Sequence, residues 1–219
     1  MSAEARFASK VSTAKSIAEH YRNFAGREYD DCITRDYGYE AHTIIPAQVL
    51  KRSEGRALKI LDLGCGTGLV ARAFFEAGAQ HEVIGVDATP EMTDCAAKLP
   101  YARVITAMAQ DALSGELAGE SFDVVLIVGM MEFIADPPAF LHRVVSSCLA
   151  DGGMLAIAVP HKQSFALEKR FGILTHPFEP MDATLRENGL SLLWSEDFNC
   201  YKLDAATQVK YRGSLWKLE

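Results

Sequence analysis

The sequence predicts an α/β domain in which a mostly parallel, doubly wound sheet carries helices on both faces. Between residues 58 and 159, short uninterrupted apolar runs alternate with helical patterns, which is typical of strands buried on both faces. The chain has 219 residues, of which 49% are hydrophobic and 23% charged, the composition of a globular domain. No repeat or Pro/Gly/Ser-rich linker divides the sequence. We therefore expect one sheet-based unit with additions at its ends.

The N-terminal segment has a helical pattern from about residue 12 to residue 53, which breaks around Gly26 and resumes near Glu40. It is also rich in tyrosine, with Tyr21, Tyr29, Tyr37 and Tyr39. We expect residues 1–55 to form a helical N-terminal cap and residues 56–219 to form the α/β domain.

The sequence pattern predicts the following strands and helices in the centre and the C-terminal part of the chain. Five apolar runs predict parallel strands at 58–63, 82–86, 103–106, 122–128 and 154–159. Helical patterns lie between them at 69–77, 90–99 and 138–149, and the last is followed by the turn Asp151-Gly152-Gly153. A helix at 180–188 and two strand-like stretches at 190–200 and 208–218 complete the chain. These two stretches can pair as an antiparallel edge of the sheet.

Charge and cysteine usage narrow the function classes. Lys plus Arg is 22 against 29 for Asp plus Glu, a formal charge of -7, which disfavours nucleic acid and anionic membranes as main partners. The five cysteines form no C-x-x-C pair and the six histidines show no metal-ligand spacing, so we expect neither a disulfide framework nor a metal site. Because the sequence shows no signal-peptide run and no apolar stretch near 18 residues, we expect a cytoplasmic protein.

The most informative stretch is a glycine-rich turn, Gly64-Cys65-Gly66-Thr67-Gly68, that follows an apolar strand and precedes a helix. Glycines at this spacing let a ligand lie against the backbone at the carboxyl end of the first strand, although a tight turn without a ligand has the same pattern. A dinucleotide fingerprint would need glycine where Leu69 stands, and a Walker loop is absent. Asp62, just before the turn, would repel a pyrophosphate. The turn therefore suits a nucleoside without phosphates.

Two further acidic residues occur at the ends of the next two predicted strands. Asp87 ends the second strand, 23 residues after Gly64, from where a carboxylate can bind both hydroxyls of a ribose. Asp111 follows the third strand and is placed to accept from an adenine amino group. A single acid at a strand end most often caps a turn. Three of them at successive strand ends, together with the glycines, favour a nucleoside site.

These motifs together resemble those of class I S-adenosylmethionine-dependent methyltransferases over about residues 58–160. The resemblance includes Phe122-Asp123-Val124-Val125-Leu126 and Gly152-Gly153-Met154-Leu155. Residues 65–71, 125–129, 21–25 and 29–30 are similar to the Williams-Beuren-region methyltransferase subgroup. The resemblance implies a Rossmann-like, seven-stranded sheet of order 3-2-1-4-5-7-6 with strand 7 antiparallel, and a helical N-terminal cap over the cofactor.

The cofactor that the resemblance implies is S-adenosyl-L-methionine, with S-adenosyl-L-homocysteine as its product. Gly64 and Gly66 would line its methionine part with Asp62 near the amino group, and Val128 and Gly129 would offer backbone groups to the same amine.

At the nucleoside end, the resemblance implies that Asp87 and Ala88 bind the ribose. Asp111 and Ala112 would flank the adenine, and Met92 would cover its face. From the cap, Tyr29 would meet the methionine end or the sulfonium.

The chemistry needs a nucleophile placed in line with the sulfonium methyl group, and a hydroxyl or ammonium acceptor must also lose a proton. Candidate bases are His161, just beyond the fifth strand, Glu132, just beyond the fourth, and His176. We prefer His161, because the end of strand five opens toward the acceptor and an imidazole titrates near neutral pH.

The residues after the fourth strand, 128–133, lack the Asn/Asp-Pro-Pro-Tyr/Phe motif of nucleic-acid N-methyltransferases with this fold. Met130 and Met131 suggest an apolar pocket wall. We therefore expect methyl transfer to an O or N atom of a small-molecule acceptor, by a monomer or homodimer. The alternatives are a catalytically silent S-adenosylmethionine-binding module and a protein or RNA methyltransferase that works with a partner subunit.

Overall fold

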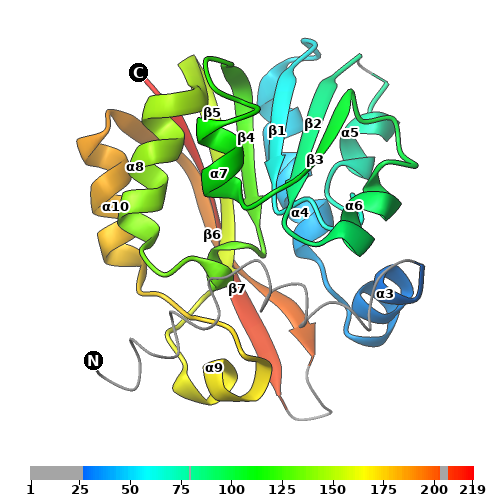
Figure 1. The fold of residues 1–219 in the computed structure, drawn as a ribbon. Coiled ribbons are helices and arrows are strands. Elements are labelled where there is room, and N and C mark those ends of the chain that lie inside the picture. The colour runs from blue at the N-terminus through cyan, green and yellow to red at the C-terminus, as the bar shows by residue number, and fades with distance from the viewer. Residues whose placement is uncertain (1–26, 79, 203–206) are drawn as a thin grey trace.

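The computed structural model describes residues 27–78, 80–202 and 207–219 (Figure 1). Its centre is a seven-stranded sheet of order β3-β2-β1-β4-β5-β7-β6. This order confirms the predicted topology. The part of the helix expected before Gly26 lies outside the described residues, as does Tyr21.

The strands are β1 (Lys59–Leu63), β2 (Glu82–Asp87), β3 (Arg103–Thr106), β4 (Phe122–Val128), β5 (Leu149–Pro160), β6 (Leu190–Lys202) and β7 (Gln208–Leu218). β1 to β5 pair in parallel, and β7 runs antiparallel between β5 and β6. Since parallel strands end at the same edge of a sheet, the turns after β1, β2, β3 and β4 lie next to one another.

The helices are α3 (Arg27–Asp31), the π-helix η1 (Cys32–Asp36), α4 (Ala41–Ser53), α5 (Arg72–Glu76), α6 (Pro90–Ala96), α7 (Ala109–Ser114), the 3-10 helix η2 (Met131–Phe133), α8 (Pro137–Cys148), α9 (Phe165–Phe171) and α10 (Phe178–Glu187). α7, α8 and α10 pack in one hydrophobic cluster with one face of the sheet. α4 and α5 pack in a second cluster with the other face (Figure 1). The helices therefore cover both faces, as a doubly wound sheet requires.

One element begins earlier than the sequence predicts. α8 ends at Cys148 and the chain passes directly into β5 at Leu149, so the predicted Asp151-Gly152-Gly153 turn lies within the strand as a register irregularity against β4. A Cβ at Gly153 would lie 2.7 Å from the carbonyl oxygen of Ala150, which explains the glycine there. The strand therefore bends at Gly153 without being interrupted.

Helices α7 and α9 were not predicted, because each is shorter than two helical turns and leaves no apolar period. The helix predicted at 69–77 is also shorter, since α5 begins at Arg72. None of the described helices is both long and apolar enough to cross a membrane.

Candidate active site

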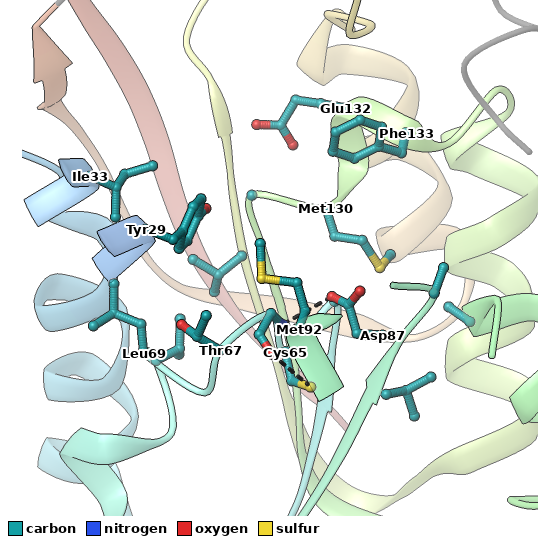
Figure 2. Close-up of a pocket in the computed structure, with 18 of the residues that line it drawn as sticks. Tyr29, Ile33, Cys65, Thr67, Leu69, Asp87, Met92, Met130, Glu132 and Phe133 are labelled. Carbon is teal, nitrogen blue, oxygen red and sulfur yellow. Dashed lines mark hydrogen bonds between the residues drawn. The ribbon is translucent and has the colours of Figure 1, made fainter. Parts of the chain in front are cut away.

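A cavity of about 320 Å³ opens at the carboxyl edge of the sheet. Its floor is the glycine-rich turn after β1, together with the ends of β2 and β4. The rest of its wall comes from α3, η1, η2, β6 and β7, so segments far apart in the sequence share one cavity (Figure 2).

The glycine-rich turn adopts backbone conformations that favour glycine. Gly64, Gly66 and Gly68 have φ values of 74°, 53° and 88°. A Cβ at Gly64 would lie 2.6 Å from the Cβ of Met130, and one at Gly68 would lie 2.5 Å from Leu99 Cδ1. A Cβ at Gly66 would meet nothing within 4 Å. Gly64 and Gly68 are thus needed for close packing, whereas Gly66 leaves open floor in the cavity.

Asp87, at the end of β2, joins the glycine-rich turn to the next loop. Its carboxylate accepts the backbone N–H of Gly66 at 2.9 Å and that of Thr89 at 2.8 Å. Burial raises its pKa, and these hydrogen bonds partly oppose the increase. Figure 2 shows the carboxylate facing the cavity, where it can accept hydrogen bonds from a ligand.

Most of the residues predicted at the cofactor site line this cavity, namely Tyr29, Gly64, Gly66, Asp87, Ala88, Met92, Val128 and Gly129. The wall next to the end of β3 is formed by Ala107, Met108, Ala109 and Gln110.

Three predicted cofactor residues lie elsewhere. Asp62 is 1% exposed beneath the turn, where its carboxylate accepts the Tyr101 hydroxyl at 2.9 Å and burial raises its pKa to about 7. Asp111 and Ala112 lie inside α7, because that helix begins at Ala109; Asp111 is exposed and Ala112 is buried in the core. The structure therefore brings Asp87 to the cavity wall but not Asp62 or Asp111.

Glu132, on η2, is the buried carboxylate at the far end of the cavity. It is 3% exposed, and its Oε1 accepts the hydroxyl hydrogen of Tyr211. Its Oε2 has no hydrogen-bond partner among the described residues. Burial raises its pKa to about 7, although the hydrogen bond from Tyr211 opposes the increase. Such a carboxyl group exchanges its proton near neutral pH.

Five tyrosines line the same cavity as this carboxylate. The cavity wall includes Tyr29 of α3, Tyr37, Tyr39, Tyr201 of β6 and Tyr211 of β7. The rings of Tyr201 and Tyr211 meet edge to face with centroids 5.8 Å apart. Burial, together with Asp87, Asp30 and Glu132, raises the pKa of Tyr29, so it stays protonated. Across the described part of the wall there is no lysine, arginine or histidine.

His161, the preferred base from the sequence, lies outside the cavity wall. It follows β5, and its backbone N–H donates to the carbonyl of Lys210 at 2.7 Å. Its ring Nδ1 is 2.9 Å from Oδ1 of Asp197 on β6, and its ring centroid is 6.1 Å from that of Phe178. The antiparallel pairing of β5 with β7 continues to Pro160, opposite Tyr211, so Tyr211 rather than His161 reaches the cavity. His176 also lies outside the wall.

Asp30 links the N-terminal segment to the turn, a role that the sequence did not reveal. Its Oδ1 accepts the hydroxyl hydrogen of Thr67, and its Oδ2 lies 2.6 Å from Nη2 of Arg72. Asp30 and Arg72 are 42 positions apart in the sequence, so no local pattern predicts their contact. The only sequence signal for a role of Asp30 was its place directly after Tyr29 in the Tyr-Asp pair. This link holds α3, and with it Tyr29, against the glycine-rich turn. In the described ranges, no three His, Cys, Asp or Glu side chains gather so as to hold a metal ion.

Comparison with known proteins agrees with this geometry. Residues 61–157 match the family called methyltransferase domain. Ubiquinone biosynthesis O-methyltransferase of Azorhizobium caulinodans is 31% identical over 140 residues, which make up 63% of this chain and 51% of that protein. The same-named protein of Rhodopseudomonas palustris strain BisB5 is 37% identical over 114 residues, 50% of this chain and 44% of that protein. The chain spans about half the length of the curated relatives it matches.

Among solved structures, magnesium protoporphyrin IX methyltransferase from Synechocystis PCC 6803, crystallised with S-adenosylhomocysteine, superposes with a TM-score of 0.69 at 16% identity. That alignment covers 98% of this chain and 100% of the other. At this identity the likeness concerns the fold. The chain is therefore similar to methyltransferase domains over residues 61–157 and shares the fold of a methyltransferase crystallised with S-adenosylhomocysteine.

Proposed function

We propose that this chain transfers the methyl group of S-adenosylmethionine to an O or N atom of a small-molecule acceptor. The observation that carries the proposal is the single cavity that joins the glycine-rich turn and Asp87 at one end to the buried carboxylate of Glu132 at the other. A donor and an acceptor bound at these two ends would meet inside it, where water is largely excluded.

The residues at the turn end fit the cofactor. The open floor above Gly66 admits a ligand against the backbone, and the carboxylate of Asp87 suits two ribose hydroxyls. Met92 is positioned to pack on the adenine, and Gln110 takes the polar role that Asp111 was expected to play. Backbone groups of Val128 and Gly129 suit the amine. When bound, S-adenosylmethionine supplies an activated methyl group on a sulfonium.

At the acceptor end, Glu132 is the proton acceptor that we propose. Its Oε2 has no hydrogen-bond partner in the described part of the chain, and its pKa of about 7 matches a base that works near neutral pH. Tyr211 positions it by donating to Oε1, which leaves Oε2 toward the acceptor. Such a base contributes a factor of about 100 to 10,000 in rate.

The names of the curated relatives support a small-molecule acceptor, since both are ubiquinone biosynthesis O-methyltransferases. The Williams-Beuren-region subgroup stays a prediction, as does the division of the chain at residue 55.

Calorimetric titration with S-adenosylmethionine and S-adenosylhomocysteine, followed by detection of S-adenosylhomocysteine released across an acceptor library, tests the proposal. We expect binding of both ligands and turnover with at least one acceptor. Binding without turnover would favour a silent binding module. Turnover only after addition of a partner subunit would favour the partner-dependent alternative.

A further inference from the structure

We propose that the acceptor binds as a protonated amine, with its cationic nitrogen held between the carboxylate of Glu132 and the surrounding tyrosines. This inference rests on the proposed function and names the acceptor class for that same site.

The first step is the charge of Glu132. A buried carboxylate is costly unless a cation or several hydrogen-bond donors meet it. Oε1 of Glu132 accepts a hydrogen bond from Tyr211, Oε2 has no partner among the described residues, and the described wall of the cavity holds no cationic side chain. An ammonium group would supply both the missing charge and a charge-assisted hydrogen bond to Oε2.

The second step is the aromatic surroundings. Tyr29, Tyr39, Tyr201 and Tyr211 line the cavity from different segments, and Tyr211, which donates to Glu132, packs edge to face with Tyr201. Burial, and after it the charge of Glu132, raises the pKa of Tyr201 and Tyr211, so both hydroxyls stay protonated beside the carboxylate that Tyr211 contacts. Aromatic faces attract cations by about 0.5 to 2 kcal/mol each, most strongly where water is excluded. Neutral or anionic acceptors gain nothing comparable.

The third step concerns the rest of the acceptor. Phe133, Ile134 and Ile173 line the cavity close to Glu132 and suit an apolar body attached to the nitrogen. A carboxylate or phosphate group there would face Glu132 without a compensating cation. The walls therefore favour an amine on an apolar body over an acidic metabolite.

The proton and electron movements balance. The ammonium gives a proton to Oε2 of Glu132, and the nitrogen lone pair freed by this step attacks the methyl carbon. The carbon–sulfur bond breaks, and its electron pair stays on sulfur. The products are the N-methylated amine, which carries one positive charge, neutral S-adenosylhomocysteine sulfur and protonated Glu132.

The competing explanation is that Glu132 and the tyrosines serve the sulfonium of the cofactor. The two are separable, because S-adenosylmethionine carries that cation and S-adenosylhomocysteine does not. If the cluster served the sulfonium, Glu132→Gln would weaken S-adenosylmethionine binding by about tenfold relative to S-adenosylhomocysteine binding. That result would overturn the amine proposal.

The test uses the full chain saturated with S-adenosylhomocysteine at pH 8, so that no sulfonium competes with the amine probe. Calorimetry compares 2-phenylethylamine, 2-phenylethanol and 3-phenylpropanoate, which differ mainly in charge. We expect the amine to bind at least about tenfold more tightly than the other two, and Glu132→Gln to remove this preference. Glu116→Gln, which neutralises an exposed carboxylate, is the charge-matched control and should keep the preference.

Equal or tighter binding of the alcohol or the propanoate would overturn the proposal. So would persistence of the amine preference in Glu132→Gln, or no amine binding up to about 10 mM. Failure of S-adenosylhomocysteine itself to bind would instead contradict the proposed function, so the two failures are distinguishable.

Discussion

At the scale of single residues, Asp87 combines a structural and a binding role. Its carboxylate fixes the backbone N–H groups of Gly66 and Thr89 and also faces the cavity. Replacing it with asparagine keeps an oxygen acceptor but removes the charge. We expect Asp87→Asn to weaken S-adenosylmethionine binding by about tenfold or more in calorimetry, since hydrogen bonds to a charged group contribute about 1.5 to 3 kcal/mol.

Asp87→Ala should weaken binding too and, in addition, lower the free energy of unfolding by about 1 to 3 kcal/mol, because it leaves two backbone N–H groups without their acceptor. Chemical denaturation of the two variants separates these effects. Unchanged cofactor affinity in Asp87→Asn would contradict the assigned ribose site.

A second residue-scale prediction concerns the base. Once an acceptor is known, Glu132→Gln should lower kcat by about 100-fold or more while the affinity for S-adenosylhomocysteine changes little, because the amide cannot take a proton. Steady-state kinetics and calorimetry on the same preparation measure both. A comparable loss of kcat in His161→Ala, with Glu132→Gln fully active, would show that the base is the one first expected from the sequence.

The sequence placed acids at three strand ends but could not tell which of them face the cavity. Asp87 is the last residue of its strand, so its side chain remains at the sheet edge. Asp111 lies two residues inside α7, and that short helix turns it toward solvent. Asp62 precedes the turn and points under it toward Tyr101. A shift of one or two positions in where a helix begins decides such orientations, and no sequence period records it.

At the scale of elements, α3 depends on Asp30 for its place above the glycine-rich turn. Asp30→Ala removes the acceptor for Thr67 and Arg72, so Tyr29 should lose its position at the cavity. We expect calorimetric affinity for S-adenosylhomocysteine to fall by about tenfold. Asp31→Ala, at the neighbouring exposed residue, is the matched control and should bind as the wild type does. Equal affinity in both variants would show that α3 does not need this link.

The turn itself gives a further prediction at this scale. Gly64 and Gly78 both have positive φ values, 74° and 80°, so alanine strains either backbone by about 1 kcal/mol. Only at Gly64 would the new Cβ overlap a neighbour, Met130, at 2.6 Å. Gly64→Ala should therefore lower the free energy of unfolding by about 1 to 3 kcal/mol more than Gly78→Ala. Equal losses in urea denaturation would contradict the close contact between β1 and the chain after β4.

The strands were predictable because each is a buried apolar run with few interruptions, and β4 was found with its observed bounds. The start of β5 was missed, since Asp151, Gly152 and Gly153 resemble a turn, although the strand passes through them. The register against β4 passes from Leu149 to Met154, so these residues form an irregularity within the strand that has the local chemistry of a turn.

At the scale of the whole molecule, two buried carboxyl groups make stability depend on pH. Burial raises the pKa values of Asp62 and Glu132 to about 7, from ordinary values of 3.8 and 4.5. The folded state therefore holds protons that the unfolded chain has released. The stability that these groups contribute is full at low pH and is lost as pH rises toward 7.

Glu132→Gln removes one of these contributions. The free energy of unfolding of the wild type should fall between pH 5 and pH 8 as this contribution is lost, whereas the variant should lack this part of the fall. The difference between the two proteins should therefore shift in favour of the variant by roughly 3 kcal/mol at most. Urea denaturation of both proteins at the two pH values measures it. A difference that is independent of pH would show that Glu132 titrates near its ordinary value in the fold.

The acceptor end of the site could be predicted only in part. Glu132 and Tyr29 were expected near the reacting groups, whereas Tyr201 and Tyr211 lie on strands beyond residue 157, where the family match ends. The resemblance implied the insertion of β7 between β5 and β6, but not which side chains of these two strands reach the cavity. The cofactor end could be predicted because the glycine-rich turn after β1 and the end of β2 supply most of its residues.

The most direct measurement is a crystal structure of the chain grown with saturating S-adenosylhomocysteine. We expect density for the adenosyl group against Gly66, with the ribose hydroxyls at the carboxylate of Asp87 and the sulfur directed toward Glu132. An empty cavity, or the ligand bound elsewhere on the protein, would contradict the central claim that this cavity joins a methyl donor to its acceptor.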